Sequence, residues 1–391
     1  MINDEEIRNE FELLKNRKIA YFDYAATAVM PNRVIEKWVD YQKNVTVFYG
    51  KGNHVLAKEA AEIFADAETV LYDHFGVAEE YELIYGKNTT ELINLMALSL
   101  QNQILPLDYI LIGPYEHHSN LLPWKYLAKK TQAIFLEMPL TEEGDIDYGY
   151  LESIRDLVKV VAFSSISNTT AYRMDIPKIC EIFDRAHVFV DESQQIAHQK
   201  IEQNRNITGY MLTSHKMYGP KNIAGAFIRR SFLEQIDPVL LGGGMVNAIG
   251  FEDTWGDGKH KFEAGTLDIG LIAAWAEACR FVREIGYDTI EAFESFCYHT
   301  VRSALKAGSG IRILGEEEHC SKSLLSFVCE QHHAHDVEYF FDQNNVIIRS
   351  GNLCAQPSIR KLGETAVNRI SFGLGISNED INRLCNLIGE L

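Results

Sequence analysis

Short, uninterrupted runs of apolar residues alternate along much of the chain with segments in which apolar residues recur every three or four positions. The short runs predict strands at 83–85, 109–112, 133–136, 159–163, 187–190, 209–212 and 223–228. The periodic segments predict helices at 31–44, 56–75 and 177–185, with two more beginning near Thr89 and after Asn120. Apolar strands joined by helices are typical of βαβ units, so we expect an α/β fold with a mainly parallel sheet. Ligands of such sheets bind beyond the carboxyl ends of the strands.

The pattern changes after a long helix predicted at 267–285. Further helices are predicted at 289–305 and 381–391, and further strands at 324–328 and 346–349. A chain of 391 residues is long for a single core. We therefore expect a large α/β domain over residues 19–275 and a smaller α+β domain over residues 276–391. Residues 1–18 are expected to form a polar leader that packs on the smaller domain.

The composition narrows the classes of partner. Hydrophobic residues make up 46% of the chain and charged residues 24%, as in ordinary globular proteins. A net charge of −18 argues against nucleic acid or an anionic membrane as a partner. No apolar run approaches the roughly 18 to 20 residues that span a bilayer. The acidic start Met1–Glu6 lacks the layout of a secretion signal, so we expect a cytoplasmic protein. Seven scattered cysteines without a C-x-x-C pair argue against a disulfide framework or a zinc site.

The segment 213–220, Thr-Ser-His-Lys-Met-Tyr-Gly-Pro, lies between two of the predicted strands. A lysine taken out of water has a lowered pKa, and its neutral amine can attack carbonyls and form Schiff bases. With the hydroxyl of Thr213 and the imidazole of His215, Lys216 could bind an anionic cofactor covalently. The alternative, a surface lysine in a strand turn, is the more common outcome for these residues taken alone.

Two further groups are predicted at the same edge of the sheet. Asp191 ends the strand 187–190, where its carboxylate could pair with a protonated ring nitrogen, and Gln194 could reach a ring substituent. The alternative for Asp191 is a helix cap or a turn. Thr89 and Thr90 lie between a strand and a helix, where hydroxyls and helical N–H groups form an anion site. Simple capping by Thr89 is compatible with that role.

His117 follows the strand 109–112 in the run Glu-His-His-Ser-Asn. Two adjacent histidines cannot easily face one metal, and no carboxylate–histidine spacing supports a metal site, so none is predicted. The more specific hypothesis is that the His117 ring stacks on a flat cofactor and acts as an acid or base. A lysine, a strand-end aspartate, an anion site and a stacking ring are the set that pyridoxal phosphate requires.

Nine motifs, which include the residues named above, are distributed over nearly the whole chain. They lie at 21–27, 88–95, 116–120, 167–168, 190–194, 214–220, 262–266, 349–357 and 368–371. With these motifs the sequence resembles the class V, fold-type I pyridoxal-phosphate enzymes, most closely the SufS/CsdA-like cysteine desulfurases, sometimes described as selenocysteine lyases. The resemblance implies a seven-stranded sheet in the large domain and a homodimer.

The resemblance also implies roles at the cofactor. Lys216 would bind it covalently, Asp191 would pair with its ring nitrogen, and Gln194 would contact its ring hydroxyl. His117 would stack on the ring and move protons. The positions that match phosphate contacts are Thr90, Thr213 and His215, with Thr89 close by, and Thr266 from the second subunit.

At the substrate, Asn168 and Arg369 match positions that hold the carboxylate, and Arg349 matches a second active-site arginine. Cys354 matches the desulfurase nucleophile, and nearby cationic groups favour its thiolate. The alternative is a small buried hydrophobe, as we expect for Cys180, Cys279 and Cys385. The implied activity removes sulfur from L-cysteine, or an analogue, to give alanine and a Cys354 persulfide for an acceptor protein. The pathway, whether iron–sulfur cluster assembly, thio-cofactor synthesis or another, stays open.

Four departures from the family pattern suggest alternative functions. They are Tyr24, Asn88, Glu192-Ser193 and Thr169-Thr170-Ala171. Glu192 is expected to make the surroundings of the cofactor bulkier and more acidic. An altered pocket would suit a class V aminotransferase, epimerase or C–S lyase acting on another amino acid. A non-catalytic scaffold or sulfur-carrier partner is disfavoured, because a binding surface needs none of Lys216, Asp191 and Cys354.

Overall fold

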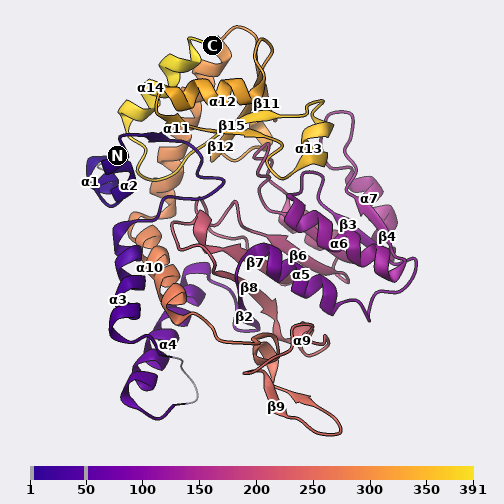
Figure 1. The fold of residues 1–391 in the computed structure, drawn as a ribbon. Helices are drawn as coiled ribbons and strands as arrows, with labels where there is room; N and C mark the ends of the chain where they lie inside the picture. Colours follow the sequence, from indigo (N-terminus) through magenta and orange to yellow (C-terminus); the bar gives the residue numbers. More distant parts are fainter. Residues whose placement is uncertain (1–3, 48–51) are drawn as a thin grey trace.

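A seven-stranded sheet lies at the centre of the computed structural model, which describes residues 4–47 and 52–391 (Figure 1). The strand order is β2-β8-β7-β6-β5-β3-β4, and β8 runs antiparallel to both of its neighbours. The strands are β2 (Tyr81–Gly86), β3 (Tyr109–Ile112), β4 (Ile134–Glu137), β5 (Val158–Ser164), β6 (His187–Asp191), β7 (Ile207–Thr213) and β8 (Ala224–Arg229). The predicted α/β class and mainly parallel sheet are confirmed.

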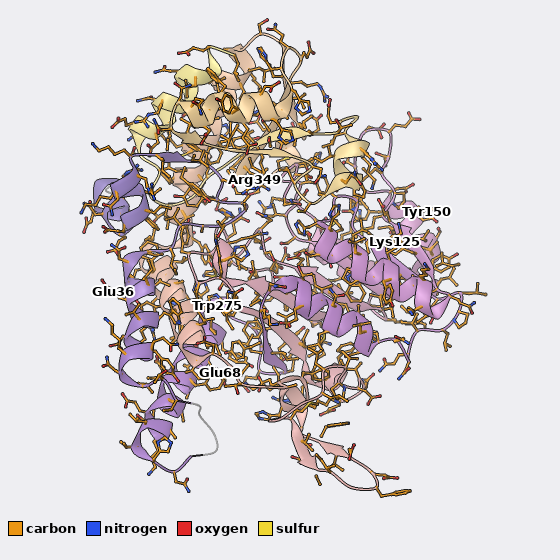
Figure 2. The ribbon with its side chains drawn as sticks, viewed as in Figure 1. Glu36, Glu68, Lys125, Tyr150, Trp275 and Arg349 are labelled. Carbon is orange, nitrogen blue, oxygen red and sulfur yellow. The ribbon has the colours of Figure 1, made fainter. Side chains whose placement is uncertain are left out.

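Helices cover both faces of the sheet, and because successive residues of a strand point to opposite sides, each strand contributes apolar residues to both. On β2, Leu83 and Tyr85 belong to one apolar cluster and Ile84 to another. The first cluster includes α3 (Asn32–Asn44), α4 (Val55–Phe75) and α10 (Ile269–Ile285), and the second includes α5 (Thr89–Ser99) and α6 (His118–Thr131). Trp275 of α10 (Figure 2) lies against Gly225 of β8, where a Cβ would be 2.8 Å from the indole ring. Glycine therefore allows this helix to approach the sheet closely.

Three shorter helices complete this part of the chain: α7 (Tyr148–Ile154), α8 (Ile176–Ile182) and α9 (Arg230–Leu233). Among the helices in residues 4–47 and 52–391, none combines the length and the apolar character needed to cross a bilayer.

The C-terminal part forms a separate antiparallel sheet with the order β11-β12-β15-β14. Its elements are α11 (Tyr287–Ala307), β11 (Ile311–Leu314), β12 (Leu324–Cys329), α12 (Ala334–Gln343), β14 (Arg349–Gly351), α13 (Gln356–Lys361), β15 (Val367–Ser371) and α14 (Asn378–Ile388). The prediction of a single strand over residues 346–349 is wrong. This stretch is divided into β13 (Val346–Ile347), which pairs with β1 (Ala20–Tyr21), and β14. The domain boundary predicted after residue 275 falls within α10, and the division into domains stays a prediction.

The N-terminal leader consists of two short helices, α1 (Asp4–Asn9) and α2 (Glu12–Arg17), and its residues 1–3 lie outside the described residues. Arg8 forms an ion pair with Asp380 of α14 at 2.5 Å and donates to the Gly375 carbonyl at 2.6 Å. The ring of Phe11 packs edge-on against Phe281 of α10. The leader therefore contacts the C-terminal part and the long helix α10.

A hairpin of β9 (Val246–Ala248) and β10 (Thr254–Trp255) projects from the main body (Figure 1). Apolar side chains are exposed on and before it, namely Leu240, Leu241, Ile249 and Phe251. Such a concentration of exposed apolar groups is typical of interaction surfaces.

Candidate active site

One cavity of about 310 Å³ lies beyond the carboxyl ends of β2, β3, β5, β6 and β7. The C-terminal part closes its other side with β15 and the β14–α13 loop. The predicted site residues that line it are Thr89, Thr90, His117, Asn168, Asp191, Gln194, Thr213, His215, Lys216, Arg349, Cys354 and Arg369. Thr266 does not line it and is exposed. Its supply to the site of a second subunit stays a prediction, as do the roles of the other residues.

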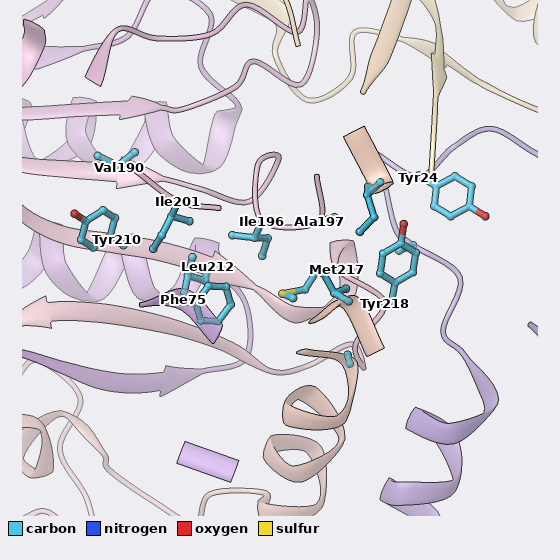
Figure 3. Packing of buried hydrophobic residues seen from close by; sticks show 14 of the residues in the cluster. Tyr24, Phe75, Val190, Ile196, Ala197, Ile201, Tyr210, Leu212, Met217 and Tyr218 are labelled. Carbon is cyan, nitrogen blue, oxygen red and sulfur yellow. The ribbon is translucent and has the colours of Figure 1, made fainter. Parts of the chain in front are cut away.

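Lys216 ends a short 3₁₀ turn, Ser214–Lys216, that follows β7. The next two residues, Met217 and Tyr218, pack inside the buried apolar cluster (Figure 3) and anchor the turn. The Ser214 hydroxyl donates to the carbonyls of Pro220 and Ile223, the latter at 3.0 Å. Burial lowers the pKa of Lys216 to about 8, although the nearby Asp191 carboxylate opposes this shift. The amine is thus held in place and is largely neutral above pH 8.

We expect the rate at which Lys216 captures an aldehyde to follow this lowered pKa. Only the neutral amine reacts, so the rate in cofactor-free protein should rise about tenfold per pH unit below pH 8 and level off above it. Rapid mixing with pyridoxal phosphate at pH 6 to 9, followed by visible absorbance, measures this rate. Nα-acetyl-lysine is the control, and its reaction should keep accelerating to about pH 10. Parallel profiles for the protein and the control would contradict the burial of Lys216.

Asp191 is the last residue of β6, with β5 and β7 paired on either side. Its side chain is buried, and its Oδ1 accepts a hydrogen bond from the Ser193 N–H at 3.0 Å. Gln194 donates from Nε2 to the carbonyl of Ala25 at 2.9 Å. These bonds hold a carboxylate and an amide side chain against the same cavity.

His117 immediately precedes α6, and its Nδ1 accepts from the Ser119 N–H at 3.1 Å. Burial, reinforced by the charge of Lys216, lowers the pKa of His117 to about 3, so the ring is neutral near pH 7. The neutral ring can stack on a flat ligand without adding a charge to the cavity.

Hydroxyl groups gather at the first turn of α5. Thr90 is 2.6 Å from the Ser119 hydroxyl, and Thr89 is 3.1 Å from the Ser193 hydroxyl. Asn88 caps the helix by accepting from the Glu91 N–H at 2.9 Å. A helix N-terminus surrounded by hydroxyls favours an anion. Ser119 and Ser193 lie within motifs of the sequence, but the sequence alone assigned them no role.

The buried polar groups fit the pyridoxal phosphate predicted from the sequence. Within the described residues, the buried Thr213 hydroxyl has no hydrogen-bond partner, although such a group normally needs one. His215 lies two residues further along the chain, and its Nδ1 is 3.2 Å from the Thr27 hydroxyl. A phosphate would satisfy Thr213, while Lys216 and Asp191 suit the aldehyde and the ring nitrogen of the same cofactor. These residues would hold the cofactor.

Cys354 lies exposed on the loop between β14 and α13, at the rim of the cavity. Its backbone φ is +53°, and that of Leu353 is +54°, which is the sparsely populated left-handed region. Three hydrogen bonds fix the loop: Asn168 to the Leu353 carbonyl (2.8 Å), His118 N–H to the Cys354 carbonyl (2.7 Å), and Cys354 N–H to Asn352 (3.1 Å). The thiol is thus accessible but held near the cavity.

Asp23, to which the sequence alone assigned no role, joins the two arginines of the cavity. Arg349 (Figure 2) donates from Nε to Asp23 Oδ2 at 3.0 Å, and Arg369 donates to Oδ1 at 3.2 Å. Arg369 also donates to the Asn168 carbonyl at 2.9 Å, while its buried Nε has no partner among the described residues. Two guanidinium groups that share one carboxylate leave a positive charge for the carboxylate of a ligand.

Of the residues that depart from the family pattern, Tyr24 and Glu192 lie away from the cavity, whereas Ser193 lines it. Tyr24 is buried, and its hydroxyl donates to the Leu374 carbonyl at 2.6 Å. Glu192 is fully buried and does not line the cavity, and burial raises its pKa to about 8. The prediction that Glu192 makes the cofactor's surroundings more acidic is therefore wrong. Asn88 does line the cavity, where it caps α5.

Comparison with known proteins agrees with this geometry. The family model described as Aminotransferase class-V matches residues 20–384. A probable cysteine desulfurase of Staphylococcus aureus is 31% identical over 98% of this chain and 96% of the relative. Among solved structures, the apo cysteine desulfurase from Thermococcus onnurineus NA1 has a TM-score of 0.93 at 28% identity, covering 99% of this chain and 97% of that chain. The cysteine desulfurase CsdA (S-sulfonic acid) from Escherichia coli has a TM-score of 0.91 at 25% identity, covering 100% and 98%. The chain belongs to the aminotransferase class-V family.

Proposed function

We propose that this protein is a pyridoxal-phosphate-dependent cysteine desulfurase, which converts L-cysteine to alanine and leaves the sulfur as a persulfide on Cys354. The observation that carries the proposal is the position of Cys354, on a hydrogen-bonded loop at the rim of the cavity that contains Lys216 and Asp191. The relatives and structural neighbours named as cysteine desulfurases over nearly the full chain length support it.

Each residue of the cavity has a task in this reaction. Pyridoxal phosphate would supply an electron sink for the bonds at the substrate α-carbon. Lys216 would bind the cofactor and, as a neutral amine, take the α-proton. His117 is the weaker base of the two, because its pKa is about 3 against about 8 for Lys216. Asp191 would hold the ring nitrogen protonated, and Gln194 would contact the ring hydroxyl. The phosphate would be held by Thr89, Thr90, Thr213 and His215.

The substrate carboxylate would bind Arg369 and Asn168, with Arg349 beside them. The Cys354 thiolate would then attack the substrate sulfur, so that an S–S bond forms as the bond from sulfur to the β-carbon breaks. The electron pair of the broken bond stays with the carbon fragment, which takes up a proton and leaves as alanine. The step needs no oxidant, because one thiol becomes a persulfide while one C–S bond becomes a C–H bond.

The exposed apolar hairpin and the exposed Thr266 support a homodimer, in which Thr266 of one subunit reaches the phosphate of the other. The exposure of Cys354 supports transfer of its sulfur to an acceptor protein. Cytoplasmic location and a role in iron–sulfur cluster assembly are part of the same proposal.

A panel of amino acids tests the proposed function against its rivals. The purified protein with pyridoxal phosphate should release sulfur and alanine from L-cysteine, with a reductant present, and should not transaminate or racemise other amino acids at comparable rates. Transamination or racemisation without sulfur release would favour the aminotransferase, epimerase or C–S lyase alternative. The positions of Tyr24 and Glu192 outside the cavity remove the main reason for that alternative.

A further inference from the structure

A buried carboxylate lies directly before the candidate stacking histidine. Glu116 is 3% exposed, and three donors surround its two oxygens. The Ser164 N–H donates to Oε1 at 2.8 Å, the Ser164 hydroxyl donates to Oε2 at 2.7 Å, and the Asn120 amide donates to Oε2 at 2.7 Å. Burying a carboxylate is costly unless it is hydrogen-bonded in this way.

These bonds join two parts of the cavity that are distant in sequence. Glu116 belongs to the β3–α6 loop that carries His117, whereas Ser164 is the last residue of β5. Ser164 is paired with Asp191 in the register of β5 and β6, and the Ser165 N–H donates to the Asp191 carbonyl at 3.1 Å. One carboxylate thus connects the loop of the stacking ring to the strand beside the ring-nitrogen partner.

A second connection reaches β6 from the other direction. Asn120, which donates to Glu116, accepts from the Trp124 indole N–H at 3.0 Å. The Trp124 ring stacks on Phe189, with centroids 5.2 Å apart, and Phe189 lies two residues before Asp191 on the same strand. Glu116, α6 and β6 therefore form a closed series of contacts, which includes Ser164 and Asp191 of the cavity.

The chain also leaves space for this carboxylate. A Cβ at Gly113 would lie 2.2 Å from Glu116 Oε1, so any side chain at that position would displace it. Burial raises the pKa of Glu116 to about 7, and the negative charge of Asp191 also raises it. The three hydrogen bonds lower the pKa and only partly offset this increase. A carboxylate offers two acceptor oxygens to these three donors, whereas an amide of the same size would face at least one of them with an N–H.

We propose that Glu116 is a positioning residue, which fixes His117 and Asp191 relative to each other so that both engage the cofactor ring. The inference rests on the proposed function for the identity of the cofactor. Glu116 does not line the cavity, so it acts through the loop and the strand end that it joins.

Glu116→Gln in the holoenzyme tests the proposal, because glutamine keeps the size but replaces one acceptor oxygen by an NH2 group, which faces at least one of the Asn120 and Ser164 donors. The variant should retain cofactor and its thermal midpoint, but its visible circular dichroism, which reports the asymmetric surroundings of the ring, should fall by about half or more. The kcat for alanine formation should fall about tenfold with KM for L-cysteine unchanged within about twofold. Glu152→Gln, an exposed glutamate on α7, is the matched control and should behave as the wild type.

Asn120→Ala is the second variant, since it leaves Glu116 in place but removes one donor and the link to Trp124. It should shift the dichroism in the same direction by a smaller amount. Wild-type dichroism and kcat in a folded Glu116→Gln protein would overturn the proposal. If Glu116→Gln does not fold, wild-type dichroism in Asn120→Ala would do so. The dichroism requires only bound cofactor, so it tests Glu116 even if L-cysteine proves not to be the substrate.

Discussion

Replacing Cys354 with alanine is expected to abolish alanine and sulfide formation from L-cysteine while leaving the visible absorbance of the bound cofactor intact. In the proposed reaction the thiolate accepts the sulfur, and no other cysteine lines the cavity among the described residues, so turnover should fall about a thousandfold or more. The cofactor should remain bound, because Lys216, Asp191 and the hydroxyls of α5 are untouched. Absorbance spectra and alanine assays on the same preparation measure both effects.

Cys385→Ala is the matched control for this experiment. Cys385 is only partly buried and lies on α14 rather than at the cavity. Its removal should leave both turnover and spectrum unchanged. Full activity of Cys354→Ala would remove the desulfurase assignment, whereas loss of the cofactor from that variant would show that the loop also holds the cofactor site together.

Replacing Lys216 with alanine should lower turnover by about a thousandfold or more, since in the proposed reaction the residue both binds the cofactor and moves the α-proton. Reduction with borohydride should attach the cofactor to the wild-type protein at Lys216 and leave the variant unmodified. Lys221→Ala is the control, because Lys221 is an exposed lysine of the same loop. Cofactor attached at another lysine, or wild-type turnover in Lys216→Ala, would contradict the assignment.

The large sheet could be predicted from the sequence because the apolar pattern that identifies each strand lies within the residues of that strand. The strands of this sheet are short apolar runs, and β2, β3, β4 and β5 are each followed by a helix whose first turn is capped by a side chain. The C-terminal sheet was predicted less well. Residues 346–349 form one extended stretch in the sequence, but residues 346–347 pair with β1 and residues 349–351 pair with β15. The choice of pairing partner depends on distant segments, so the local pattern could not reveal it.

The location of the candidate site could also be predicted from the sequence, because the carboxyl ends of parallel strands meet at one edge of the sheet. The residues that the sequence missed act through non-local hydrogen bonds. Asp23 joins Arg349 and Arg369, and Glu116 binds Ser164, although nothing near either acid in the sequence indicates these partners. Glu192 was placed wrongly beside the cofactor. It lies one residue beyond the end of β6, where it is fully buried and does not line the cavity, and its position next to Asp191 in the sequence does not show which way its side chain points.

The proposed transfer of sulfur to Cys354 is tested by the mass of the Cys354 peptide after the holoenzyme has reacted with L-cysteine and before any reductant or acceptor is added. This peptide should gain the mass of one sulfur atom, dithiothreitol should remove it, and alanine should form in equal amount. Alanine formation with an unmodified Cys354, or with the sulfur on another cysteine, would contradict the proposed transfer.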